Sequence, residues 1–198
     1  MNEKASASKG FGMRTLKFHC LKCADCCRDL LKTVRIEGTM FQEGLHLYPE
    51  EVKKLKNLAY QYEGEVTIRP KWKASSTNKV IAYQLVNHSC PFLRENVCRI
   101  YSKRPLSCRF YPRTSWGSID SSCRWVKKHG VDKPLKEGEI TIVSRQLHEA
   151  FKKVSSKLYE LILKNAPRRQ LILYDFKGKK KTTIDAKKFL NRYRSDNR

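Results

Sequence analysis

The stretch Cys20-Leu21-Lys22-Cys23-Ala24-Asp25-Cys26-Cys27 holds four of the chain's eight cysteines. Its first three cysteines are spaced C-x2-C-x2-C, and a two-residue gap lets a tight turn direct successive sulfurs toward one metal centre, as in bacterial ferredoxins. Neighbouring side chains diverge, so we expect Cys27 either to serve a second site or to be a free thiol beside the first. The stretch predicts a domain organised around a metal centre.

The other cysteines are more widely spaced. Cys90, Cys98, Cys108 and Cys123 are separated by seven, nine and fourteen residues. Because a zinc ribbon has two C-x2-C pairs and this half has none, the spacing favours an iron–sulfur cluster over zinc, with both metals kept open. Eight cysteines could form two four-ligand sites, or one site plus structural thiols. Three histidines close to cysteines in the sequence are alternative ligands, although a supporting or surface role is the simpler expectation: His19, His88 and His129.

Disulfides are not expected, because an extensive disulfide framework is typical of a secreted chain. The opening residues, MNEKASASKG, have no apolar core and do not resemble a signal peptide. A membrane span needs about 18 consecutive apolar residues, and no such run is present. We therefore expect a cytoplasmic protein whose clustered thiols are metal ligands or redox groups.

A second motif covers residues 90–112 and reads C-P-F-L-x4-C-x-I-Y-x2-R-P-x2-C-R-x-(F/Y)-P. Together with C-x2-C-x2-C-C at residues 20–27, it resembles the YkgJ-type CxxCxxCC cysteine-cluster family, described as zinc- or iron-chelating. The resemblance covers nearly half of the chain and implies metal binding by Cys20, Cys23, Cys26, Cys27, Cys90, Cys98 and Cys108. Cys123 is added as a candidate ligand, although it lies outside these two motifs.

The resemblance leaves the question of catalysis open, since the family also includes flagellin lysine N-methylases. Common catalytic signatures are absent: the sequence has no G-x-G-x-x-G, P-loop, H-E-x-x-H or G-x-S-x-G. Within the second motif, Glu95-Asn96 predicts a turn that brings Cys90 and Cys98 together. Three arginines are expected to lower thiol pKa values and offset thiolate charge: Arg99, Arg104 and Arg109.

Hydrophobic periodicity predicts an α+β fold: a small cysteine-rich, metal-centred domain with short strands, one long amphipathic C-terminal helix and a basic C-terminal extension. We expect a flexible arm at 1–14, the metal-binding domain at 15–138, and a helix with a basic strand and helix extension at 139–198. Strands are predicted at 33–36, 65–69, 79–86, 170–176 and 182–184, and helices at 49–62, 121–129, 140–165 and 186–194.

The chain is strongly basic, with 42 Lys and Arg against 19 Asp and Glu, a formal net charge of +23. Such an excess attracts polyanions. Residues 164–198 hold 12 basic and 3 acidic residues, and interleaved aromatic rings complete a composition typical of a nucleic-acid surface. RNA is favoured over DNA because no helix-turn-helix or zinc-finger pattern is present. The predicted contacts are Arg168, Arg169, Lys177, Lys179, Lys180, Lys181, Lys187, Lys188, Arg192 and Arg194.

Three functional hypotheses follow from these patterns. The first is a protein stabilised by an iron–sulfur cluster, of the 4Fe-4S type, or by zinc, whose basic surface binds RNA or a ribonucleoprotein such as the ribosome. The second is an iron–sulfur enzyme or redox protein, related to protein lysine N-methylation by the family resemblance. The third is a metal carrier that hands over its ion through exposed thiolates.

Overall fold

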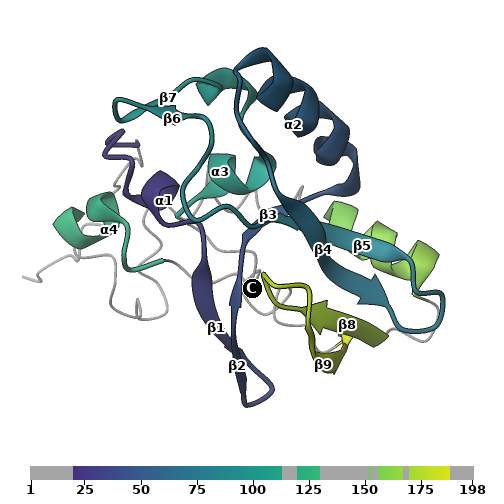
Figure 1. The fold of residues 1–198 in the computed structure, drawn as a ribbon. Helices are drawn as coiled ribbons and strands as arrows, with labels where there is room; N and C mark the ends of the chain where they lie inside the picture. The colour runs from purple at the N-terminus through teal and green to yellow at the C-terminus, as the bar shows by residue number, and fades with distance from the viewer. Residues whose placement is uncertain (1–19, 113–119, 130–151, 153–155, 167–169, 188–198) are drawn as a thin grey trace, which may run out of the picture.

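The computed structural model describes residues 20–112, 120–129, 152, 156–166 and 170–187 (Figure 1). It combines helices and strands, which confirms the predicted α+β class. Its elements, in chain order, are α1 Asp25–Arg28, β1 Lys32–Ile36, β2 Thr39–Glu43, β3 Leu45–Leu47, α2 Pro49–Gln61, β4 Ile68–Ala74, β5 Val80–Leu85, β6 Leu93–Arg94, β7 Val97–Cys98, the 3-10 helix η1 Tyr101–Lys103, α3 Leu106–Phe110, α4 Arg124–His129, β8 Gln170–Tyr174 and β9 Lys180–Asp185.

The largest sheet has five antiparallel strands in the order β3-β5-β4-β8-β9. Strand β8 pairs directly with β4, with Trp72 opposite Leu173, so the C-terminal hairpin belongs to the same sheet as the central strands. Strands β1 and β2 form a separate hairpin, whose carbonyl at Gln42 accepts a hydrogen bond from the backbone of Phe176. The described part of the C-terminal region is therefore joined to the body of the molecule by backbone pairing.

Strand β4 contains an irregularity that matters for the site. The register with β5 shifts between Pro70 and Trp72, so Lys71 is an extra residue with no counterpart on the partner strand. A bulge interrupts the alternation of side chains between the two faces. As a result Lys71 and Trp72 are both buried, although they are neighbours in the sequence.

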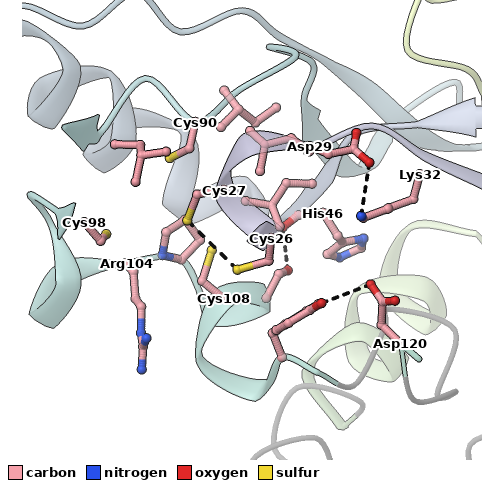
Figure 2. A pocket seen from close by; sticks show the side chains of 18 of the residues that line it. Cys26, Cys27, Asp29, Lys32, His46, Cys90, Cys98, Arg104, Cys108 and Asp120 are labelled. Atoms are coloured by element: carbon pink, nitrogen blue, oxygen red, sulfur yellow. Dashed lines mark hydrogen bonds and ion pairs between the residues drawn. The ribbon is translucent and has the colours of Figure 1, made fainter. Parts of the chain in front are cut away.

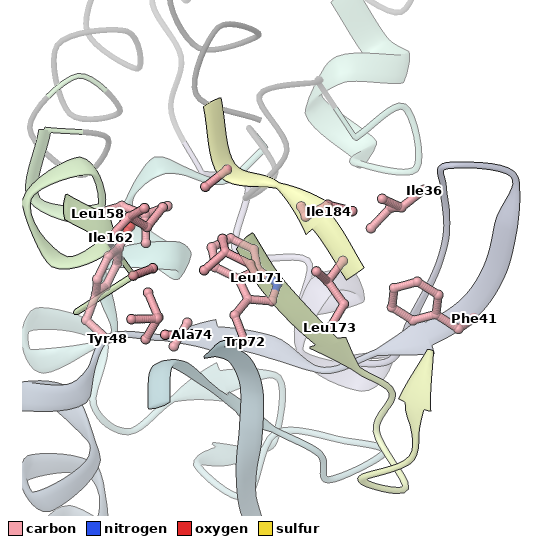
Figure 3. Close-up of a cluster of buried hydrophobic side chains, with 14 of the residues drawn as sticks. Ile36, Phe41, Tyr48, Trp72, Ala74, Leu158, Ile162, Leu171, Leu173 and Ile184 are labelled. Atoms are coloured by element: carbon pink, nitrogen blue, oxygen red, sulfur yellow. The ribbon is translucent and has the colours of Figure 1, made fainter. Parts of the chain in front are cut away.

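Two clusters of buried side chains stabilise the sheet. One contains Trp72, Leu171 and Leu173 from the sheet together with Leu158 and Ile162 from the helical residues 156–165 (Figure 3). The other cluster packs helix α2 against strands β3 and β5 and against residues of the second cysteine segment. Cys90 and Cys98 pack against this cluster. Its buried members are Leu30, Leu47, Leu55, Leu58, Ala59, Leu85, Phe92 and Ile100.

Most predicted elements have counterparts, with shifted bounds. Pro49 begins α2 as expected, and Glu51 accepts a 2.9 Å hydrogen bond from the backbone of Tyr48. The strand predicted at 65–69 instead begins at Ile68 and continues to Ala74, and the short strands β2 and β3 were not predicted. Of the long helix predicted at 140–165, residues 152 and 156–165 are described and helical. The arm at 1–14, the rest of that helix and residues 188–194 of the last one lie outside the described residues.

Candidate metal centre

Six cysteines from three separate segments line one cavity of about 710 Å³: Cys20, Cys26, Cys27, Cys90, Cys98 and Cys108. Figure 2 shows the side chains of Cys26, Cys27 and Cys108 directed toward one another, with Cys90 and Cys98 beyond Cys27. The sulfurs of Cys26 and Cys27 lie 4.0 Å apart. Every cysteine of the chain is a free thiol. The cavity thus brings together thiols that are far apart in the sequence.

The first cysteine segment folds back through residues in the left-handed region. Lys22 has φ +52° and Ala24 has φ +62°, which turn the chain into the one-turn helix α1. The carbonyl of Ala24 then accepts hydrogen bonds from the backbones of Cys27 and Arg28. This tight local path places Cys26 and Cys27 on a single turn, so both side chains border the cavity.

The second segment is bonded to the first through its backbone. The N–H of Cys90 donates a 2.6 Å hydrogen bond to the carbonyl of Cys27, and the N–H of Leu30 donates to the carbonyl of His88 at 2.9 Å. Beyond Cys90, the hairpin β6–β7 turns at Glu95 and Asn96, both with positive φ. The predicted turn at these two residues is confirmed, and it brings Cys98 back toward Cys90.

Helix α3 carries Cys108 and is held by two polar contacts. The Glu51 carboxylate, at the start of α2, accepts a 2.8 Å hydrogen bond from the backbone of Leu106. The Ser107 hydroxyl donates to the carbonyl of His46 on β3 at 2.6 Å. These contacts fix a helix of only five residues, which by itself has too few hydrogen bonds to be stable.

Cys23 and Cys123 are not among the residues that line the cavity. The Arg124 side chain, on α4, makes two 3.1 Å hydrogen bonds to the carboxylate of Asp25 on α1. Burial raises the pKa of the Cys123 thiol, and the nearby sulfurs of Cys23 and Cys26 raise it further. The segment after Pro112 therefore returns to the first cysteine segment.

Four of the cavity cysteines, Cys26, Cys27, Cys98 and Cys108, hold their protons strongly. A hydrogen bond with Cys27 raises the pKa of Cys26, and burial adds to the effect. For Cys27, the hydrogen bond from Cys26 lowers the pKa, but its bond to Cys90 and burial outweigh it and raise the pKa to about 12. Burial also raises the pKa of Cys98 and Cys108. Thiolates formed here would repel one another unless a cation joined them.

Only part of the predicted role of the arginines is supported. Burial raises the pKa of Cys98 and Cys108, and the charge of Arg104 lowers both pKa values in part, as expected for this arginine. Arg99 instead lies over the ring of Tyr62 at 4.7 Å. Arg109 donates to the backbone carbonyls of Arg104 and Ser102.

The cavity thiols are suited to a metal that prefers sulfur ligands, although their sulfur atoms are too far apart to bind one ion together. Among the residues that the structure describes, no three His, Cys, Asp or Glu side chains are arranged to hold an ion as they stand. Several free thiols facing one cavity are nevertheless the ligands that zinc and iron–sulfur clusters prefer. The residues fit such a centre if its binding draws the sulfurs together.

The comparison with known families agrees with this chemistry. The family model CxxCxxCC, described as "Putative zinc- or iron-chelating domain", matches residues 19–127, more than half of the chain. The chain belongs to the CxxCxxCC family. No curated protein and no solved structure matches it significantly. The family predicted from the two sequence motifs is thus confirmed.

Membership in the CxxCxxCC family supports metal binding, with zinc or iron as the metal. The matched region continues past Pro112 and contains Cys123 as well as the other seven cysteines. Which of the two metals is bound, and which cysteines bind it, stays a prediction. None of the described helices combines the length and apolarity needed to cross a membrane.

The predicted nucleic-acid contacts are only partly described. Lys177, Lys179, Lys180 and Lys181 are exposed on the β8–β9 hairpin, and Lys187 is exposed just after it. Lys181 is engaged by the Asp175 carboxylate at 3.2 Å. The remaining five predicted contacts lie outside the described residues: Arg168, Arg169, Lys188, Arg192 and Arg194. RNA binding stays a prediction.

The histidine at the cavity is not one of the three that the sequence analysis considered as metal ligands. His88 is exposed, His129 packs on the ring of Trp125 at 4.3 Å, and His19 lies outside the described residues. The histidine that lines the cavity is His46, which the sequence analysis missed. Its only sequence signal is a polar residue between two leucines in a short strand, which is common in half-buried strands.

Proposed function

We propose that the cysteine cavity holds a thiolate-ligated metal centre, and that this centre is an iron–sulfur cluster. The observation that carries the proposal is the convergence of six free cysteines, from three segments, on one cavity. A structural zinc ion binds four ligands, so six thiols exceed the needs of one zinc. An iron–sulfur cluster with spare neighbouring thiols, or a centre with more than one metal, accounts better for this number.

The first role of such a centre is to join the segments that carry its ligands. The first and second segments are connected by two backbone hydrogen bonds, and α1 and α3 have four and five residues. Short elements of this kind gain much of their stability from a bound metal. When bound, the cluster would supply a cross-link and a one-electron redox group. Burial of Cys90 and Cys98 against the apolar cluster around Phe92 would limit access of water to it.

A matched pair of variants in the β6–β7 hairpin tests this proposal. Cys98→Ser removes one cavity thiol, whereas Arg94→Lys changes an exposed side chain of the same hairpin that does not line the cavity. We expect anaerobically purified Cys98→Ser protein to contain less metal and to unfold at a lower temperature. The Arg94→Lys protein should keep both properties. Equal metal content in the two variants would contradict a ligand role for Cys98.

RNA binding is the second candidate function, supported by the group of exposed lysines on the β8–β9 hairpin. A triple variant, Lys177→Gln, Lys179→Gln and Lys180→Gln, should weaken binding to RNA and reduce its dependence on salt concentration. The matched control changes three exposed lysines on α2, Lys53, Lys54 and Lys56, and alters net charge equally. If both triple variants lose affinity to the same extent, the hairpin is not a specific RNA site.

A further inference from the structure

The cysteine cavity also has a polar floor, built from three strand residues that the metal proposal does not use. Lys71, from the bulge in β4, is 1% exposed and pairs with the Glu43 carboxylate on β2 at 2.9 Å. His46, on β3, packs against the ring of Trp72, the residue that follows Lys71 on β4. All three residues line the same cavity as the cysteines.

His46 is the unusual member of the floor. The residue is 3% exposed, and its ring packs edge-on against Tyr48 and at a tilt against Trp72, with ring centroids 4.9 Å and 4.8 Å away. Neither ring nitrogen has a hydrogen-bond partner among the residues that the structure describes. About nine in ten buried polar groups in proteins have such a partner. A buried imidazole with two unpaired nitrogens therefore indicates that another molecule bonds to it.

The protonation state of His46 narrows the chemistry of that molecule. Burial lowers the pKa of the imidazole well below its ordinary value, and the nearby Lys71 charge acts in the same direction. A neutral imidazole offers one N–H donor and one nitrogen acceptor. The Lys71 ammonium on the same floor is paired with Glu43, but basic residues outnumber acidic ones around the whole cavity, so its lining favours an oxygen-bearing, negatively charged group such as a carboxylate.

The size and lining of the cavity indicate an organic ligand rather than an inorganic ion alone. A volume of about 710 Å³ lies within the range of about 300–1,000 Å³ typical of small-molecule sites. Apolar side chains including Ile36, Leu85, Phe92 and Phe110 contribute to its walls. Six basic residues and three acidic residues line the cavity. This excess of basic residues would also offset the charge of thiolates at the metal centre. The unpaired nitrogens of His46 therefore support an organic ligand more directly.

We propose that the cavity is also a ligand site, in which a small organic carboxylate contacts His46 and Lys71 beside the metal centre. Its acid group would accept hydrogen bonds from the floor, and its apolar part would lie against the hydrophobic wall. A purely structural metal centre needs no such space or floor. The proposal therefore goes beyond metal binding and gives the centre a molecule on which to act or to which it can respond.

Calorimetric titration of the full-length, metal-loaded protein tests this site. Benzoate serves as the probe, benzamide as its neutral counterpart, and sulfate as an anion without an apolar part. We expect saturable binding of benzoate, with weaker binding of the other two. His46→Phe keeps a flat ring but removes both nitrogens, and the loss of one hydrogen bond should weaken binding by about fivefold. The control His88→Phe alters an exposed histidine outside the cavity and should bind normally.

Metal content, measured in every sample, separates this proposal from the preceding one. Loss of benzoate binding in His46→Phe at unchanged metal content supports the ligand site. Three results would overturn it: no saturable binding of benzoate, equal binding by the wild type and His46→Phe, or loss of metal together with binding, which would make His46 a metal ligand instead. If His46→Phe does not fold, His46→Gln keeps a donor and an acceptor, and its retained preference for benzoate over benzamide decides the question.

Discussion

The backbone N–H of Cys90 donates a 2.6 Å hydrogen bond to the carbonyl of Cys27. Together with the hydrogen bond from the N–H of Leu30 to the carbonyl of His88, this contact joins the two cysteine segments, which lie far apart in the sequence. Because the two backbones are bonded at these residues, the thiols of Cys27 and Cys90 both face the same cavity. The backbone therefore brings the thiols together in part, and metal binding would complete their approach.

Alkaline pH should destabilise the metal-free protein. The pKa of Cys27 is raised from 9.0 to about 12, so its folded form keeps a proton that the unfolded form loses above about pH 9. The resulting stabilisation is complete below pH 9 and is lost as pH rises through about 12. Chemical denaturation between pH 7.5 and about 10.5 should show falling stability, and Cys27→Ser should show a smaller fall. An identical pH dependence in both proteins would contradict a raised pKa at Cys27.

Metal binding should release protons. Because burial and neighbouring sulfurs raise the pKa of Cys27 and Cys108, these thiols are protonated near neutral pH and must ionise to bind a metal. The affinity for Zn²⁺, used as a probe ion, should therefore increase with pH. Competition with a chromophoric chelator in several buffers measures this dependence. An affinity that is independent of pH would mean that thiolates already exist before binding.

The buried ion pair beneath the cavity should be essential for stability. Lys71→Met removes the ammonium that pairs with the buried Glu43 carboxylate at 2.9 Å, and breaking a buried pair costs about 3–5 kcal/mol. The double variant Lys71→Met, Glu43→Gln should recover part of this loss. Urea denaturation of the three proteins measures the effect. If the double variant is as unstable as the single one, the remaining charge on Glu43 is not the cause.

The contact between Asp25 and Arg124 should control access to Cys123. Both side chains are partly exposed, so we expect Asp25→Asn to change stability by less than about 1 kcal/mol. It should nevertheless increase the rate at which a thiol reagent modifies Cys123 in the metal-free protein, because α4 loses its contact with α1. Asp29→Asn removes another exposed ion pair of this segment, with Lys32, and is the control; Asp25 itself also pairs with Arg28 within α1 at 3.2 Å. Equal rates in both variants would show that α4 is held by other contacts.

The β8–β9 hairpin should be indispensable for folding. Leu171 is fully buried between the sheet and the helical residues, and Leu→Ala changes in a core cost about 2–5 kcal/mol. Leu163→Ala, at a position that is 43% exposed, should cost much less. Thermal unfolding compares the two variants. Since β8 pairs with β4, deletion of residues 164–198 would remove part of the sheet, so point variants are the cleaner test of RNA binding.

The sequence predicts the parts of this fold that depend on local signals. The helix predicted at 49–62 does begin at Pro49, a residue type that favours the first helical position, and Glu95-Asn96 predicts the turn between two cysteines. The pairing of β8 with β4 depends on contacts between distant segments, which periodicity does not report. The buried Lys71 could not be foreseen either, since lysine is normally exposed and only the bulge in β4 turns it inward.

The candidate site was predictable to a similar degree. Cysteine spacing identified the thiols, because metal ligation constrains both the residue type and the gap between residues. It did not predict that Cys23 and Cys123 stay outside the cavity lining that the other six share, since this depends on how the folded segments meet. Nor did it predict His46, whose burial and unpaired nitrogens are properties of the folded chain.

Metal and sulfide analysis of anaerobically purified full-length protein, combined with its visible absorption spectrum, tests the central claim most directly. An iron–sulfur cluster predicts brown protein that contains iron and acid-labile sulfide in similar amounts, and whose colour is lost in Cys27→Ser and Cys108→Ser. Colourless protein with stoichiometric zinc would contradict the cluster, and folded protein without bound metal would contradict the metal centre itself.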